Sequence, residues 1–95
     1  MDDKLLHYIA SIIHETRMNA SLYLGASPRA SIAVMNCAKA IAAMRNRDFV
    51  IPEDVVEMVP HVLRHRIMLT PEKEMEGIRT DDVIAQIIKM VEIPR

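Results

Sequence analysis

The sequence predicts an all-α domain built as a bundle of four to five helices. Apolar residues recur at helical spacing in four separate stretches, whereas two glycines and five prolines leave little turn chemistry for β-hairpins. Hydrophobic residues make up 51% of the chain but only three residues are aromatic, so Ile, Val, Leu, Met and Ala must form the core. At 95 residues the chain is long enough for one modest core, and residues 1–95 are expected to form a single domain.

The first helix is predicted over residues 2–17. Its apolar stripe repeats every three to four residues and consists of Leu5, Ile9, Ile12, Ile13 and Thr16, widened by Leu6 and Tyr8. Asp2 and Asp3 place negative charge at the partly positive start of the helix, and Arg17 places positive charge near its end. A connection is expected to follow over residues 18–26.

The second helix is predicted over residues 28–46, with Ser27 as its N-cap and Pro28 in the first helical position. Its main apolar face consists of Ala30, Ala33, Val34, Cys37, Ala38, Ile41 and Met44. Because its other faces are also largely apolar, this helix is expected to be the central and most buried element. Cys37 is the single cysteine and is expected to be buried and reduced, which does not favour a nucleophilic role.

The third helix is predicted to start at Pro52, after a short extended connector. Its apolar stripe consists of Val55, Met58, Val59, Val62 and Leu63. Glu53 and Asp54 suit the first turn, although Ile51 is a poor N-cap. Pro60 lacks a backbone N–H, so it is expected to kink this helix or divide it in two.

A fourth helix is predicted over residues 80–91, with Thr80 as its cap. Its apolar face consists of Val83, Ile84, Ile87, Ile88 and Val91. Between the third and fourth helices, residues 67–79 are weakly periodic and carry Glu72, Glu74 and Glu76, an acidic loop at residues 72–76. This segment predicts a surface loop with room for one helical turn.

Charge and hydropathy exclude several classes of function. The net charge is −1, with six basic and three acidic residues in residues 1–47 and six basic and ten acidic residues in residues 48–95. Neither half has the basic surplus of a nucleic-acid-binding protein. The start of the chain is acidic and no apolar run approaches 18 residues, so neither a signal peptide nor a membrane span is predicted. We expect a cytoplasmic protein.

One arginine stands where helix electrostatics disfavours a cation. Arg29 follows Ser27 and Pro28, so it falls in the first turn of the second helix, near free N–H groups and a partial positive charge. A cation there costs about 0.3–1 kcal/mol unless an anion lies nearby. A phosphate can accept hydrogen bonds from helix-end N–H groups and from a guanidinium together. The alternative is a solvated arginine that turns to water or to a carboxylate.

Three segments carry a resemblance to a known family. These are Leu-Gly-Ala-Ser-Pro-Arg-Ala at residues 24–30, Arg-Asp-Phe-Val-Ile-Pro-Glu-Asp-Val at residues 47–55, and Val-Leu-Arg-His-Arg-Ile at residues 62–67. In order and spacing they resemble the C-terminal lid of MoxR-type AAA+ ATPases, with the ATPase subunits of magnesium chelatase as nearby relatives. The resemblance covers essentially the whole chain and implies the helical bundle of an AAA+ lid.

The resemblance implies a function for the start of the second helix. Arg29 matches the sensor-2 arginine, which reaches the γ-phosphate of ATP bound on the core domain of the same subunit. Gly25, Ala26, Ser27 and Pro28 would then shape the nucleotide-facing start of the helix. The family further implies ATP and Mg²⁺ in a parent protein, hexameric rings, and chaperone-like action on partner proteins, often ones with von Willebrand factor A domains.

The chain lacks the Gly-rich phosphate loop that ends in Gly-Lys-Ser or Gly-Lys-Thr. We therefore expect it to be a lid from a longer ATPase, with the nucleotide-binding core absent. By itself it is expected neither to hydrolyse ATP nor to hold a cofactor. A free-standing helical protein-interaction or DNA-binding module remains the alternative.

A basic cluster and a histidine series complete the candidates. Arg64, His65 and Arg66 match the family's Leu-Arg-His-Arg segment and could sense phosphate, contact a neighbouring subunit or pair with acidic residues. Glu57, His61 and His65 recur every four residues, but Pro60 interrupts their helix and Arg64 crowds the second histidine. No metal site is predicted. His7 and His14 lie two helical turns apart, too far to share an ion, and are expected on the surface.

Overall fold

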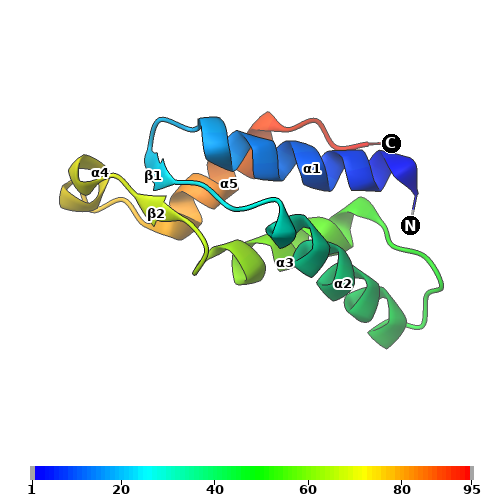
Figure 1. Cartoon of the computed structure of the whole chain (residues 1–95). Coiled ribbons are helices and arrows are strands. Elements are labelled where there is room, and N and C mark those ends of the chain that lie inside the picture. The colour runs from blue at the N-terminus through cyan, green and yellow to red at the C-terminus, as the bar shows by residue number, and fades with distance from the viewer. Residues whose placement is uncertain (1, 95) are drawn as a thin grey trace.

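The computed structural model describes residues 2–94, which form five helices and one two-stranded antiparallel sheet (Figure 1). In chain order the elements are α1 (Asp3–Met18), β1 (Leu22–Leu24), α2 (Arg29–Met44), α3 (Pro52–Leu63), β2 (Met68–Leu69), α4 (Pro71–Met75) and α5 (Thr80–Met90). The predicted all-α bundle of four to five helices is therefore confirmed, with a small hairpin as an addition.

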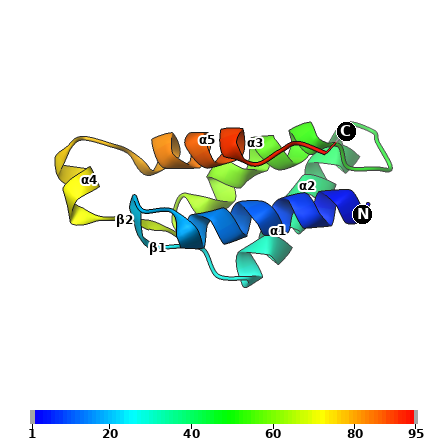
Figure 2. The same ribbon diagram turned by 90° about the horizontal axis from the view of Figure 1, so that it is seen from above.

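The described chain is elongated, with extents of 43 × 21 × 21 Å. Helices α1, α3 and α5 run along its length, and α2 packs against α3 and α1 (Figures 1 and 2). The hairpin and α4 lie at one end, and both chain termini lie at the other. One hydrophobic core joins these helices, and among residues 2–94 its buried members are aliphatic side chains and Tyr8.

Helix α1 forms as the sequence predicts. The Asp2 carboxylate caps it by accepting a hydrogen bond from the Lys4 backbone N–H at 2.8 Å. Its buried residues are Leu5, Tyr8, Ile9, Ile12, Ile13 and Thr16, which confirms the predicted stripe except for Leu6, which is 39% exposed. His7 and His14 are exposed, as expected.

Helix α2 is less buried than predicted. Only Ala30, Val34, Ala38 and Ala42 are buried, one residue per turn. Cys37 is half-buried, and 79% of Met44 is exposed, so the prediction of a central helix with a broad apolar face was wrong. The physical reason is that α2 lies against one side of the bundle, so a single alanine-rich stripe meets its neighbours.

The starts of α2 and α5 correct two predicted N-caps. Helix α2 begins at Arg29 with Pro28 as its cap residue, and no side chain caps it. Pro28 already has helical backbone angles, because proline fixes φ near the helical value, and the Ser27 carbonyl accepts from the Ala30 N–H at 2.9 Å. Ser27 is therefore not the side-chain cap. Helix α5 begins at Thr80, and the Asp82 carboxylate accepts from the Arg79 N–H at 2.9 Å in place of a Thr80 cap.

Helix α3 continues through Pro60, so the prediction of a divided helix was wrong. Proline removes one backbone donor, but Val55, Val59 and Leu63 are fully buried on both sides of it and hold the helix against the core. The Asp54 carboxylate accepts from the Ile51 N–H at 3.0 Å, which compensates for the poor cap.

Asp54 is also the buried end of an ion-pair network. It is fully buried, and both of its oxygens accept from the Arg47 guanidinium at 2.7 Å, while Arg45 lies 3.5 Å away. The hydrogen bonds from Arg47 hold the pKa of the Asp54 carboxyl below its usual value, against the effect of burial. This network fastens the end of α2 to the start of α3.

The two predicted connections pair with each other. Leu22 lies opposite Leu69 and Leu24 opposite Met68, with an irregularity between them, and the Thr70 N–H donates to the Ser21 carbonyl at 3.0 Å. The acidic segment then forms α4, the single helical turn that the sequence allowed for, with no buried residue. Strands of two and three residues are too short to show a period-2 pattern, so the sequence did not predict the hairpin.

Candidate functional site

The segment 25–28 is held tightly against the end of α1. A Cβ atom at Gly25 would lie 2.6 Å from the Thr16 carbonyl oxygen and 2.7 Å from the Arg17 Cα, so only glycine permits this approach. The Thr16 hydroxyl donates to the Ile13 carbonyl at 2.6 Å and accepts from the Ala26 N–H at 3.0 Å. The start of α2 is thereby fixed relative to Arg17.

Arg29 is the first residue of α2 and its side chain is exposed. Among residues 2–94 it has no hydrogen-bond or ion-pair partner for its guanidinium. The next residue, Ala30, is fully buried and anchors the helix in the core. Arg29 therefore lies at an uncapped helix N-terminus with its charge unpaired, and it does not fold inward.

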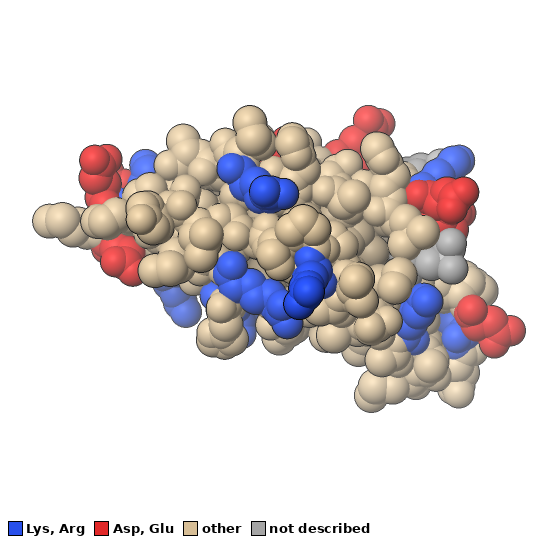
Figure 3. Space-filling model, viewed as in Figure 1, with Lys and Arg blue, Asp and Glu red and all other residues tan. Residues whose placement is uncertain are grey.

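A surface hollow of about 570 Å³ lies beside this helix start. It is lined by residues 23–28 together with Arg17 and Arg66, and no lining residue is acidic. Figure 3 shows several Lys and Arg side chains in the middle of the face seen in Figure 1, where no Asp or Glu side chain lies beside them. The hollow and Arg29 thus form one basic region, which has the chemistry to bind an anion.

The three residues of the basic cluster at residues 64–66 have different surroundings. The Arg64 guanidinium donates to both oxygens of Asp81, at 2.9 and 3.0 Å, and these hydrogen bonds hold the pKa of the Asp81 carboxyl below its usual value. His65 and Arg66 are exposed. Arg64 therefore joins α3 to α5 by ion pairing, whereas Arg66 lines the hollow.

The sequence did not indicate that Arg17 lines the hollow, because Arg17 was interpreted only as a favourable charge at a helix end. Two structural facts bring it to the hollow: the close contact of Gly25 and the hydrogen bond from Ala26 to Thr16. The nearest sequence signal was the glycine two residues before Ser27, since a glycine often marks close approach of two backbones.

Residues 14–87 match the family model described as the AAA lid domain. The chain belongs to the AAA lid domain family. It is 43% identical over 93 residues to the uncharacterized protein YeaC of Bacillus subtilis, covering 98% of this chain and 29% of that protein. It is 36% identical over 100 residues to the chaperone MoxR1 of Mycobacterium tuberculosis, covering 96% of this chain and 26% of that protein.

The fold comparison agrees with the family. The crystal structure of a candidate ATPase from Cytophaga hutchinsonii superimposes with a TM-score of 0.93 at 38% identity, over 99% of this chain and 31% of that one. The lid domain is also homologous to the lid region of the magnesium-chelatase subunit ChlI. It is the lid of a MoxR-like AAA ATPase, and it spans less than a third of the length of each relative described above.

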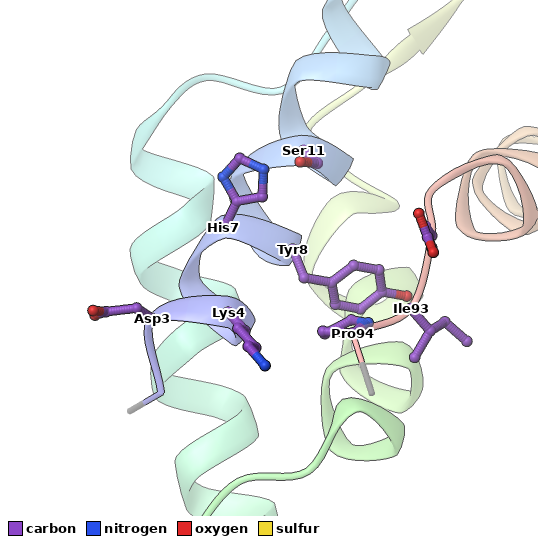
Figure 4. A pocket seen from close by; sticks show the side chains of 8 residues that line it. Asp3, Lys4, His7, Tyr8, Ser11, Ile93 and Pro94 are labelled. Atoms are coloured by element: carbon purple, nitrogen blue, oxygen red, sulfur yellow. The ribbon is translucent and has the colours of Figure 1, made fainter.

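A second cavity lies between the first half of α1 and the C-terminal segment of the lid domain. Its volume is about 620 Å³, and Figure 4 shows the Tyr8 ring extending from α1 toward Ile93 and Pro94, with Lys4 and His7 beside it. The Tyr8 hydroxyl is buried and has no hydrogen-bond partner within the described residues 2–94, and burial raises its pKa, with Glu53 adding to the effect. No predicted site residue lies here.

The histidine series does not form a metal centre in the described part of the lid domain. Residues 2–94 contain no group of three or more His, Cys, Asp or Glu side chains placed to hold a metal ion. Glu57 instead contacts the Arg45 guanidinium at 2.7 Å. Within the same residues, every helix is too short or too polar to cross a bilayer.

Proposed function

We propose that this lid domain contributes Arg29 as the sensor-2 arginine of a longer MoxR-like AAA+ ATPase. The observation that carries the proposal is an exposed, unpaired guanidinium at the uncapped N-terminus of α2. Helix N–H groups and an arginine fork can bind the same phosphate, so this position suits the terminal phosphate of a nucleotide. The short loop at Gly25, Ala26, Ser27 and Pro28 fixes the start of the helix next to it.

In this proposal ATP and Mg²⁺ bind mainly to the AAA+ core domain of the same longer chain, and the lid supplies one wall of the site. The guanidinium of Arg29 stabilises negative charge on the γ-phosphate as it develops in phosphoryl transfer. Because Arg29 is fixed to the rigid α2, gain or loss of that phosphate can also move the lid as a body.

The proposal extends to the assembly. Homology to the chaperone MoxR1 supports a chaperone-like role in which nucleotide state drives remodelling of partner proteins. The resemblance to MoxR-type proteins adds a hexameric ring and clients that carry von Willebrand factor A domains. Arg64 stays outside these roles, because it is already paired with Asp81 within the lid.

The test is ATP turnover by the longer protein with Arg29→Ala. We expect a decrease of about 100-fold or more, the usual effect of removing one charge-stabilising donor from a transition state. Arg79→Ala is the matched control, since it removes an exposed arginine from the start of α5 and is expected to leave turnover unchanged. Circular dichroism should show equal helix content in both variants. Unchanged turnover in Arg29→Ala would contradict the proposal.

A further inference from the structure

The arginines among residues 2–94 differ in whether a carboxylate pairs with them. Arg45, Arg47 and Arg64 all pair with carboxylates, Asp54, Glu57 or Asp81. Arg79, at the start of α5, is exposed and has no ion pair among residues 2–94. Arg17, Arg29 and Arg66 are likewise exposed and have no carboxylate partner among these residues, and they differ from Arg79 in where they lie. The chain has 13 acidic residues, so the lack of partners reflects where the three arginines lie and not a shortage of acids.

The fold brings these three arginines from distant parts of the sequence to one place. Arg17 ends α1 and meets Gly25 through the close backbone contact. Arg66 lies just before β2. Because Leu24 pairs with Met68, Arg66 comes close to residues 25–26, which directly follow β1. Both line the 570 Å³ hollow, whose last lining residue, Pro28, is followed directly by Arg29.

Two like charges on one hollow, with a third directly after its last lining residue, are unfavourable in the absence of an anion. Each would gain free energy from a nearby carboxylate, and the lid supplies such partners to Arg45, Arg47 and Arg64. Small side chains line the hollow between them, at Gly25, Ala26 and Ser27, and leave space for a ligand. A ligand that meets three separated cations must itself carry several negative charges along its length.

We propose that Arg17 and Arg66, together with Arg29, form a binding site for the polyphosphate chain of a nucleotide. Arg29 binds the phosphate at one end of the polyphosphate, and Arg17 and Arg66 bind the phosphates that lie in the hollow. This inference rests on the proposed nucleotide-binding role of Arg29 and adds two residues to it. Arg17 and Arg66 are binding residues here, since they touch the ligand without acting on the bond that breaks.

The test is titration of the 95-residue chain with inorganic tripolyphosphate at low ionic strength. Binding is measured by calorimetry and by changes in the backbone amide NMR signals of residues 25–27 and 29. We expect saturable binding that is at least about tenfold tighter than that of orthophosphate, because a single phosphate cannot reach three cations. Arg17→Ala and Arg66→Ala should each weaken binding about 5- to 10-fold, as expected for a lost charge-assisted hydrogen bond.

Arg79→Ala and Lys39→Ala serve as controls because each removes one exposed positive charge elsewhere on the lid. Arg17→Lys and Arg66→Lys keep the charge and should retain part of the affinity. Any of three results overturns the inference: no binding by the wild type, equal affinity for orthophosphate and tripolyphosphate, or equal weakening by the control variants.

The outcomes separate this inference from the proposed function. Binding that depends on Arg29 alone rejects the roles of Arg17 and Arg66 and leaves the sensor-2 proposal intact. Normal tripolyphosphate binding, combined with unchanged ATP turnover of Arg29→Ala in the longer protein, rejects the sensor-2 proposal and leaves the anion site.

Discussion

Asp54 shows how one carboxylate can hold two helices together. The charge is completely buried, which is costly unless donors satisfy it, and here two arginines and one backbone N–H do so. The sequence identified Asp54 only as a favourable charge in the first turn of a helix. Its pairing with Arg47 depends on the turn between α2 and α3, where Asn46 adopts a left-handed conformation with φ of 60°.

We expect Asp54→Asn to lower the free energy of unfolding by about 3 kcal/mol, because it leaves the Arg47 guanidinium without its buried counter-charge. Urea unfolding followed by circular dichroism measures the loss. Glu57→Gln is the control: it removes an exposed partner of Arg45 and should cost less than about 1 kcal/mol. Equal losses of unfolding free energy in the two variants would contradict the larger contribution expected from the buried Asp54 ion pair.

Gly25 and Arg29 differ in whether the neighbouring sequence alone explains the residue found at that position. The need for glycine at residue 25 comes from a contact with α1, which lies eight or nine residues away in sequence and cannot be deduced from local turn chemistry. Arg29, by contrast, was identified from its place in the first helical turn alone. The structure adds that its side chain is exposed and unpaired among the described residues.

Among the elements, the amphipathic helices were easier to predict than the apolar one. α1 and α5 each have one apolar stripe and a polar remainder, so periodicity located both the helix and its buried face. α2 is apolar on nearly every side, so periodicity located the helix but not the face that meets the bundle. The hairpin needs residues from two connections more than 40 positions apart, and neither strand is long enough to be recognised alone.

Two substitutions in α2 test which face is buried. Val34 is fully buried and Ile32 is 57% exposed, although the two residues are near neighbours in sequence. We expect Val34→Ala to reduce the free energy of unfolding by about 2 kcal/mol, from lost apolar contact and a residual cavity. Ile32→Ala should cost less than about 1 kcal/mol. Thermal or urea unfolding measures both, and a larger loss for Ile32→Ala would contradict the assigned face.

Across the whole molecule, arginines that pair with carboxylates and arginines that do not pair lie in different places. Paired arginines lie at the junctions of α2 with α3 and of α3 with α5, where they stabilise the bundle. Two arginines without a carboxylate partner, Arg17 and Arg66, line the hollow, and Arg29 follows its last lining residue, Pro28. A net charge near zero conceals this separation, so composition alone gave no indication of the proposed anion site.

The stability of the whole domain should fall in acid. The pKa of Asp54 is lowered in the folded state, so its contribution is fully present above the ordinary value of 3.8 and is lost as the pH falls below it toward the folded value. We therefore expect the difference in unfolding free energy between wild type and Asp54→Asn to shrink as the pH falls from 5 to 2. Urea unfolding at a series of pH values measures it, and a constant difference would contradict the lowered pKa.

The sequence by itself determined the helical class, the positions of the long helices, the family resemblance and the placement of Arg29 at a helix start. All of these depend on local periodicity, capping chemistry or short motifs, which need no knowledge of the chain's distant parts. Only the tertiary structure decided that α2 buries a single stripe, that Arg64 pairs with Asp81 while Arg66 does not, and that Arg17 reaches the hollow. Those outcomes depend on contacts between residues far apart in sequence, and such contacts exist only once the helices have packed.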